Sequence, residues 1–203
     1  MTTIYLIRHA QSHPSIRMQD SQWPLSTRGR AQAEALSLLL EPLGIRELWS
    51  SPYRRCLETV APFAKRAGLR FQLHDGLRER NIAGGIVDNF SEIWSKSWKD
   101  FGFALPGCES STVAQARFVQ TVGEILRTSD AATIGVCAHG NVLGLLLNHI
   151  DEANGRAETE SLLNPDVLRV LVADDQITWD RTFRLPGIKS LATPHTATPI
   201  ERE

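Results

Sequence analysis

The chain has 203 residues, of which 42% are hydrophobic, and its 22 lysines and arginines nearly balance 23 aspartates and glutamates. These proportions are typical of a globular domain with a full core, and they argue against a disordered or fibrous chain. The charge balance gives no basic footprint for nucleic acid, and no apolar run approaches the roughly 20 residues that span a bilayer. We therefore expect no nucleic-acid partner and no membrane partner.

The N-terminus and the cysteines bear on location. The first residues lack the basic lead and the long apolar run of a secretory signal. Cys56, Cys108 and Cys137 are odd in number, far apart and without a CxxC pair, which favours reduced thiols. We expect a cytoplasmic protein in which each cysteine is a small buried residue, and the pattern leaves the oligomeric state open.

Strand-like and helix-like segments alternate along the chain, a pattern typical of α/β domains. Short apolar runs predict strands at 3–7, 45–49, 69–73 and 133–138. Helical periodicity predicts helices at 25–40, 51–67, 110–127 and 141–150. Ser26 or Thr27 can cap the first of these helices, and Ser51 followed by Pro52 is a start signal for the second.

The remaining segments complete the expected architecture. We expect a polar loop at 75–85 and an insertion or lid at 87–105, in which Trp94 and Trp98 mark a short helix and pack in the core or the lid rather than on a substrate. Segments 167–173 and 177–183 predict a hairpin that adds an antiparallel edge. We expect one domain over 1–190, a three-layer α/β/α sandwich with a mostly parallel central sheet, and a frayed tail at 191–203.

Polar side chains follow the four predicted parallel strands at the points where the strands end. Because the carboxyl ends of parallel strands gather at one edge of a sheet, we expect these side chains to form one site. Cations there, together with the N-terminus of the helix after position 139, favour an anionic ligand. The side chains concerned are Arg8, His9, Arg54, Arg55, Arg78, Glu79 and His139.

Five sequence blocks occur in a recognisable order at 6–12, 25–33, 51–59, 77–80 and 136–140, and they lie within residues 3–150. The first contains Arg8-His9, the third has the pattern Ser-Pro-x-x-Arg from Ser51 to Arg55, and the last ends in His139-Gly140. Together they resemble the signature of the histidine phosphatase superfamily, the phosphoglycerate-mutase-like proteins. One block alone would be a weak signal, whereas five in order are a strong one.

The resemblance implies a role for each matching position. His9 corresponds to the nucleophile that takes the phosphoryl group, and Glu79 to the proton donor for the leaving oxygen. Phosphate oxygens would be held by Arg8, Arg55 and His139, with Arg54 as the register alternative to Arg55. Further substrate contacts are expected from Ser12, Ser15, Gly140, Asn141 and Arg78.

Two residues of the first block depart from the family pattern. Ala10 stands where glycine is usual, which matters only if the backbone there needs a positive φ. Ser15 stands where an asparagine often supports the phosphate, and its hydroxyl can still donate a hydrogen bond.

Elementary chemistry supports the same assignment of roles. Phosphoryl transfer needs in-line positioning and positive charge around the phosphate oxygens, which two arginine forks provide. Neighbouring cations also favour a neutral, nucleophilic imidazole. This chemistry requires no metal and no organic cofactor. His9 and His13 share a zinc-like spacing, but Pro14 and the preceding strand favour a loop, so we expect no metal site.

Other polar residues have simpler interpretations. We expect Arg54 and Arg80 to be solvated surface arginines or helix-cap partners. For Arg78, such a role and substrate binding are about equally favoured. Glu109 reads as favourable charge at a helix start. Structural or surface roles are expected for His74, His149 and His195.

The sequence thus predicts a phosphomonoester hydrolase that acts through a phosphohistidine intermediate. Its partner would be a small phosphorylated metabolite or inorganic phosphate. The alternatives are a cofactor-dependent phosphoglycerate-type mutase and a non-catalytic phosphate-binding regulatory protein. The resemblance implies longer insertions in mutases than the roughly 30 residues between Glu79 and Glu109, so hydrolysis is favoured.

Overall fold

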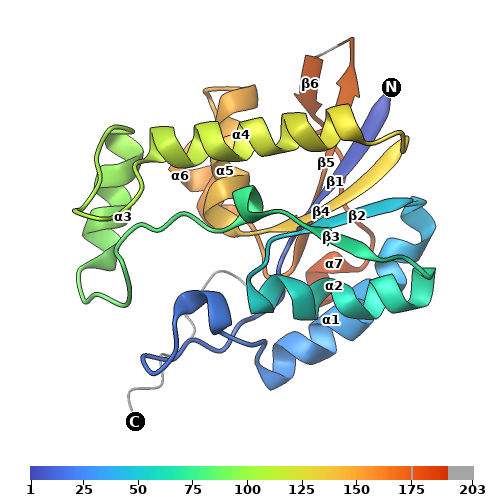
Figure 1. Ribbon diagram of the computed structural model, residues 1–203, viewed down its shortest axis with the longest axis horizontal. Helices are drawn as coiled ribbons and strands as arrows, with labels where there is room; N and C mark the ends of the chain where they lie inside the picture. The colour runs from blue at the N-terminus through green and yellow to red at the C-terminus, as the bar shows by residue number, and fades with distance from the viewer. Residues whose placement is uncertain (175, 192–203) are drawn as a thin grey trace.

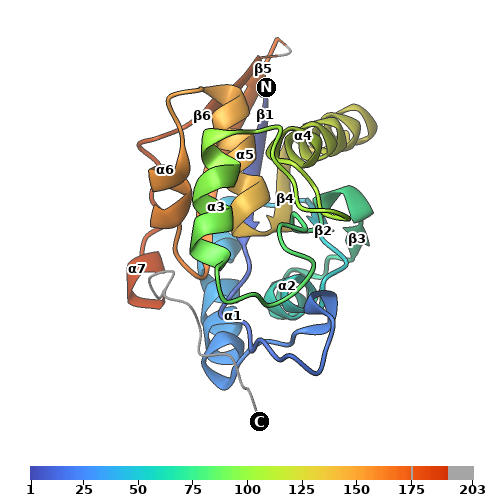
Figure 2. The same ribbon diagram turned by 90° about the vertical axis from the view of Figure 1, so that its left-hand side faces the viewer.

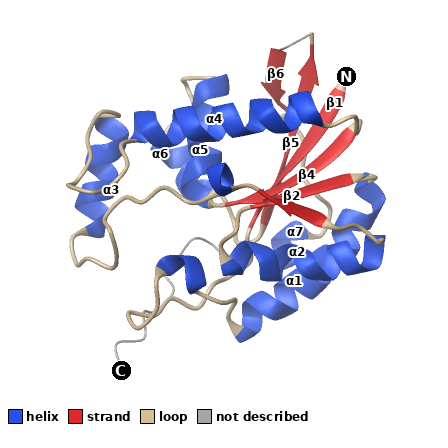
Figure 3. Cartoon of the chain, in the orientation of Figure 1, coloured by secondary structure: helices blue, strands red, loops and turns tan. Residues whose placement is uncertain are grey.

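The computed structural model describes residues 1–174 and 176–191. Its centre is a six-stranded sheet in the order β3-β2-β4-β1-β5-β6 (Figures 1 and 3). The pairs β1–β4, β4–β2 and β2–β3 are parallel, whereas β5 runs antiparallel to both β1 and β6. The strands are β1 (Thr2–Arg8), β2 (Glu47–Ser50), β3 (Phe71–Leu73), β4 (Thr133–Ala138), β5 (Asp166–Ala173) and β6 (Gln176–Trp179).

Helices cover both faces of this sheet. In Figure 1, α4 and α5 lie above the sheet and α1, α2 and α7 below it, and Figure 2 shows the same division. The α-helices are α1 (Thr27–Leu40), α2 (Arg54–Ala67), α3 (Phe90–Lys99), α4 (Ser111–Thr128), α5 (Gly140–Ile150), α6 (Arg156–Ser161) and α7 (Ile188–Leu191). Short 3-10 helices are η1 (Asp20–Gln22), η2 (Glu41–Leu43) and η3 (Asp75–Leu77).

The three layers follow from the two-residue repeat of a strand. Ile4 and Leu6 of β1 belong to a core cluster with α4 and α5, whereas Tyr5 and Ile7 belong to a second cluster with α1, α2 and α7. Successive side chains of a strand point to opposite faces, so a continuous apolar run buries both. The predicted three-layer α/β/α sandwich with a mostly parallel sheet is confirmed, as is the hairpin that adds an antiparallel strand.

Local signals explain most element boundaries. Ser26 caps α1 by accepting the Gly29 N–H at 2.9 Å. Gly68, at φ 66°, ends α2 in the left-handed conformation that glycine adopts easily. The expected helix start at Ser51-Pro52 is wrong, because α2 begins at Arg54 with Tyr53 at the N-cap. The Ser51 hydroxyl instead contacts a histidine of the site.

Two further differences concern the C-terminal third. The second hairpin strand ends at Trp179 rather than at 183, and α6 and α7 were not expected, because both are too short for a periodic pattern to emerge. The proposed tail, apart from Leu191, lies outside the described residues, as does His195.

The segment 87–105 contains the expected short helix. α3 stands apart from the sheet, at the left in Figures 1 and 3. Trp94 stacks on Phe90 and meets the edge of Trp98, and its Nε1 donates to Glu160 of α6 at 2.9 Å. The two tryptophans therefore pack with neighbouring side chains, as the sequence predicts.

Candidate active site

Two histidines meet at the carboxyl edge of the two central strands. β1 and β4 pair in parallel, with Arg8 opposite Ala138, so that His9 and His139 follow directly after paired residues. Their ring centroids lie 5.2 Å apart at an interplanar angle of 63°. Both residues are buried. The sheet register thus brings together two imidazoles that are 130 positions apart in the sequence.

Hydrogen bonding defines which nitrogen of His9 can act as a base or nucleophile. Its Nδ1 lies 2.7 Å from the carbonyl oxygen of Ala10. A carbonyl can only accept, so Nδ1 carries the proton and the lone pair resides on Nε2. Thr59 Oγ1 accepts the Ala10 N–H at 3.0 Å, and Asn164 Nδ2 donates to the His9 carbonyl at 2.9 Å. Ala10 does not have a positive φ, so alanine fits where the family pattern has glycine.

His139 is held in the opposite tautomer. Arg55 Nε donates to His139 Nδ1 at 3.2 Å, and because a guanidinium only donates, Nε2 must carry the proton. That nitrogen lies 2.8 Å from Ser51 Oγ. Burial, followed by the charge of Arg55, holds the pKa of His139 well below its usual range. His139 is therefore neutral in the unliganded site.

The two candidate arginines of α2 have different surroundings. Arg55 is 5% exposed, contacts His139, and donates Nη1 to the Asp20 carbonyl at 2.6 Å. Its guanidinium carbon also lies 4.8 Å from the centre of the Tyr53 ring. Arg54 points away, with 51% of its side chain exposed and Nε 2.6 Å from Glu58. Arg55 belongs to the site, and Arg54 is a surface residue.

Arg8 provides a second buried positive charge at the site, besides Arg55. Its Nη1 donates to the Leu162 carbonyl at 2.6 Å. Burial lowers the pKa of Arg8 to about 10, opposed by the charges of Glu79 and Asp166, so the group remains charged at neutral pH. A Cβ at Gly140 would lie 2.8 Å from the Arg8 guanidinium carbon. Glycine at this position thus lets the arginine lie against the start of α5.

Glu79 occupies the N-terminus of α5. Its Oε2 accepts the N–H of Asn141 at 3.2 Å, and its Oε1 accepts the N–H groups of Val142 at 3.2 Å and Arg80 at 2.9 Å. Burial raises the pKa of Glu79, and these N–H groups and the charge of Arg55 partly offset it. The sequence predicts that this helix end favours an anionic ligand, and the group found there is the carboxyl group of Glu79.

The predicted substrate contacts differ in their surroundings. Asn141 is 5% exposed, and neither its Oδ1 nor its Nδ2 has a hydrogen-bond partner among the described residues. Ser15 is also buried, with its Oγ accepting the Arg17 N–H at 3.2 Å. Ser12 forms a backbone bridge with Leu25 that anchors the segment leading from β1 to α1.

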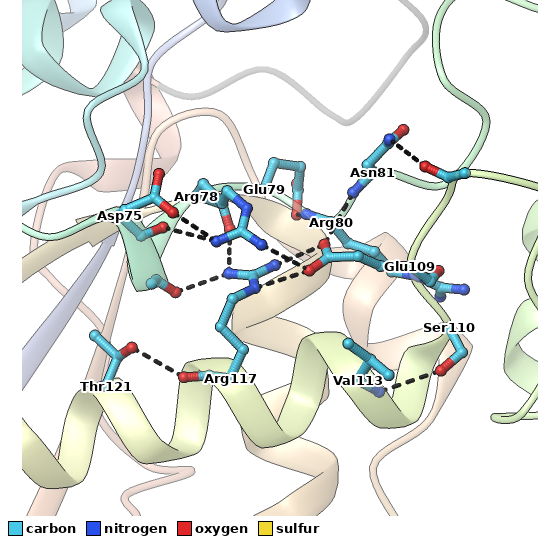
Figure 4. Close-up of polar contacts among 12 residues, drawn as sticks. Asp75, Arg78, Glu79, Arg80, Asn81, Glu109, Ser110, Val113, Arg117 and Thr121 are labelled. Carbon is cyan, nitrogen blue, oxygen red and sulfur yellow. Dashed lines mark hydrogen bonds and ion pairs between the residues drawn. The ribbon is translucent and has the colours of Figure 1, made fainter.

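A second polar network lies beside the site, built around Glu109 (Figure 4). Glu109 accepts from Arg117 at 3.0 and 2.8 Å and from Arg78 at 3.0 Å. Its interpretation as helix-start charge is incomplete, because it joins α4 to the loop that carries Glu79. Arg78 is also paired with Asp75 at 2.8 Å, so two carboxylates already hold its guanidinium.

Of the two roles expected for Arg80, the solvated surface arginine is wrong, because its side chain bonds residues at the start of α4. It is 4% exposed and donates Nε to the Glu109 carbonyl at 2.9 Å and Nη1 to Ser111 Oγ at 2.6 Å. Sequence reasoning missed this network because an arginine within a polar loop carries no periodic signal. Arg117, within α4, likewise resembles an ordinary polar position of an amphipathic helix.

The remaining titratable residues have structural or surface positions. Cys56 and Cys137 are buried as expected, whereas Cys108 is only partly buried, because it lies in the loop before α4. His74 contacts Glu124 at 3.2 Å and the Gly76 N–H at 3.0 Å, and His149 is exposed.

The described residues contain neither a candidate metal cluster nor a candidate membrane span. Within residues 1–174 and 176–191, no three His, Cys, Asp or Glu side chains gather as a metal ion would require. In the same part of the chain, no helix is both long and apolar enough to cross a membrane.

Comparison with protein families agrees with the geometry. The model of the histidine phosphatase superfamily (branch 1) matches residues 4–182. The chain therefore belongs to the histidine phosphatase superfamily. This confirms the resemblance seen in the five blocks and, at the level of the family, the prediction of a histidine phosphatase enzyme.

Individual proteins show the same likeness. Probable phosphatase C1687.21 of Schizosaccharomyces pombe is 28% identical over 173 residues, which cover 81% of each chain. The structure of mycobacterial glucosyl-3-phosphoglycerate phosphatase Rv2419c with VO3 has a TM-score of 0.74 at 19% identity, covering 89% of this chain and 98% of that one. Phosphoglycerate mutase from Bacillus anthracis str. Sterne has a TM-score of 0.72 at 18% identity, covering 88% and 91%. These two structures share the fold.

Proposed function

We propose that this protein hydrolyses phosphomonoesters of small metabolites by a double displacement through a phosphohistidine at His9. The observation that carries the proposal is the 2.7 Å contact between His9 Nδ1 and the Ala10 carbonyl, which assigns a proton to Nδ1 and makes Nε2 the nitrogen that would attack phosphorus. In the first step Nε2 bonds to phosphorus as the P–O bond to the alcohol breaks. In the second, water displaces the histidine, and inorganic phosphate leaves.

The cations would stabilise the charge that spreads over the transferring phosphoryl group. Arg8 and Arg55 are buried forks that can each donate two hydrogen bonds to phosphate oxygens. A bound dianion would also favour protonation of His139, which then donates to a third oxygen. Glu79, whose pKa burial raises, would give its proton to the leaving oxygen and then take one from the attacking water.

Groups around this centre would recognise the rest of the substrate. The Asn141 amide, which has no hydrogen-bond partner within the described part of the chain, can bond an oxygen of the leaving group, and Ser12, Ser15, Gly140 and Arg78 remain proposed contacts. Residues 1–190 would form one domain, in which the segment 87–105 selects the substrate. Three free cysteines support a cytoplasmic location.

The decisive experiment traps the intermediate. The protein is incubated with a phosphoryl-labelled monoester, denatured at alkaline pH, where phosphohistidine survives, and digested to locate the label. We expect label on the peptide containing His9, none in His9→Ala, and wild-type labelling in His149→Ala, whose histidine is exposed and distant in sequence. Absence of label together with absence of phosphate release would reject the proposal.

The mutase alternative predicts a different product. A mutase returns the phosphoryl group to another hydroxyl, so a phosphoglycerate would be isomerised with little free phosphate. Measuring isomer and phosphate together separates the two reactions. A non-catalytic binder would bind phosphate without turnover or labelling.

A further inference from the structure

The loop that carries Glu79 has no regular secondary structure to hold it. Glu79 follows η3, and residues 79–81 lie in neither helix nor strand. Yet a proton donor must stand within hydrogen-bond reach of the leaving oxygen, and a displacement of about 1 Å can cost about a hundredfold in rate. Some other part of the fold must therefore fix its backbone.

Arg117 of α4 holds the backbone on the N-terminal side of Glu79 by hydrogen bonds. Its Nη1 donates to the carbonyls of Gly76 at 2.8 Å and Arg78 at 3.0 Å. Its other nitrogens form a two-pronged pair with the Glu109 carboxylate (Figure 4). Both side chains of this pair are largely buried, at 13% and 15% exposed.

Glu109 holds the backbone on the C-terminal side of Glu79 by hydrogen bonds. Its Oε2 accepts the Asn81 N–H at 3.3 Å, its N–H donates to the Asn81 carbonyl at 2.8 Å, and its carbonyl accepts from Arg80. Burial alone would raise the pKa of Glu109. The contacts with Arg117 outweigh this effect and hold the pKa below its usual range. The pair therefore stays ionised when Glu79 is protonated.

The geometry points to the Glu109–Arg117 pair as the positioning device for the carboxyl group of Glu79. Glu79 then lies between two supports, with its backbone tied to α4 through this pair and its carboxylate tied to the first N–H groups of α5. α4 and α5 pack against each other in one core cluster through Phe118, Val122, Leu143 and Leu146. Neither Glu109 nor Arg117 is assigned a contact with the phosphoryl group.

This inference rests on the proposed function and predicts a selective defect. Loss of the pair should slow only those reactions in which the leaving oxygen needs a proton. 2,4-Dinitrophenolate leaves without one, whereas phenolate from phenyl phosphate needs one. We compare kcat/KM for these two substrates, because this quantity includes no step after the first P–O bond breaks and is independent of breakdown of the phosphoenzyme.

Arg117→Met is the main variant and Glu109→Gln the second. In both, kcat/KM for phenyl phosphate should fall at least about tenfold more than that for dinitrophenyl phosphate, which is the pattern expected of Glu79→Gln. The ratio of the two values does not depend on how much enzyme is folded. Arg66→Met, which removes an exposed pair with Glu41, is the matched control and should leave the ratio unchanged. Equal losses on both substrates in both variants would overturn the inference.

A second measurement works without turnover. Amide hydrogen exchange at Asn141 and Val142 reports the contacts of their N–H groups with Glu79, whereas Leu143 donates to the His139 carbonyl and serves as reference. Arg117→Met should speed exchange at the first two positions and not at the third. Unchanged exchange at all three amides would reject the positioning role. This result does not depend on phosphatase activity, since failure of the proposed function would show separately as missing turnover.

Discussion

The hydroxyl of Ser51 lies 2.8 Å from Nε2 of His139, on the side of the ring opposite the bond from Arg55. The two contacts together fix both the tautomer and the plane of a buried imidazole. Ser51 therefore acts on the site through His139, although the sequence suggests a helix cap.

Replacing Ser51 by alanine should leave the Nε2–H of His139 without its hydroxyl partner. We expect a loss of about 1–3 kcal/mol in unfolding free energy and a fall of about tenfold in kcat/KM. Ser50→Ala, which removes a neighbouring buried hydroxyl that donates to the Ser51 carbonyl at 2.9 Å, is the control. Denaturant titration and steady-state kinetics measure the two effects, and equal kinetics in both variants would contradict the assignment.

Arg54 and Arg55 provide a test with adjacent residues. Arg55→Met removes a buried cation beside His139, and we expect kcat/KM to fall by about a hundredfold or more. Arg54→Met removes only an exposed pair with Glu58, so its activity should remain within about threefold of wild type. The reverse order of effects would show that the register of the third block is wrong.

Phosphate binding should be accompanied by proton uptake. His139 is neutral in the unliganded site because burial and the charge of Arg55 lower its pKa. A bound dianion opposes both effects, so we expect uptake of up to about one proton near neutral pH. Calorimetric titration with inorganic phosphate in buffers of different ionisation enthalpy measures this number. His139→Gln should reduce the number of protons taken up, and an equal number in wild type and variant would contradict the prediction.

The same histidine should make the fold sensitive to acid. Since the pKa of His139 is lower in the folded than in the unfolded chain, the unfolded state binds the extra proton first as pH falls. The stabilisation is thus complete above about pH 6.5 and is lost as pH falls toward the folded-state pKa, with a slope of up to about 1.4 kcal/mol per pH unit. Denaturant titrations from neutral to acidic pH should show this slope in wild type and a shallower one in His139→Gln.

Two glycines within helices should respond to alanine with opposite signs. At Gly144 of α5 a Cβ would lie 2.0 Å from Thr159 Oγ1, so Gly144→Ala should destabilise the protein by about 1–3 kcal/mol. At Gly123 of α4 it would meet only the end of the Arg127 side chain at 3.3 Å, and Gly123→Ala should stabilise it by about 0.5–1 kcal/mol. Thermal unfolding measures both, and an unchanged or raised Tm for Gly144→Ala would be inconsistent with the packing of α6 on α5.

The parts of the fold that could be predicted are those with a repeating local signal. β1 and β4 were recognisable as apolar runs, and placing polar residues at their ends was enough to bring His9 and His139 together. Side-chain identity could not reveal Ser51 as a partner of His139, since serine before proline is also a good helix start. Nor could it reveal the burial of Arg80 or the pairing of Glu109 with Arg117, because these depend on where α4 crosses the loop.

His9 and His139 follow neighbouring strands whose last residues, Arg8 and Ala138, are paired in register. Adjacent strands lie about 4.8 Å apart by backbone geometry alone, which is close to the spacing of the two rings. The distance between the two imidazoles therefore follows from the main chain rather than from the packing of side chains. Substitutions in α3, which stands apart from the sheet, would therefore leave the spacing of the two histidines unchanged.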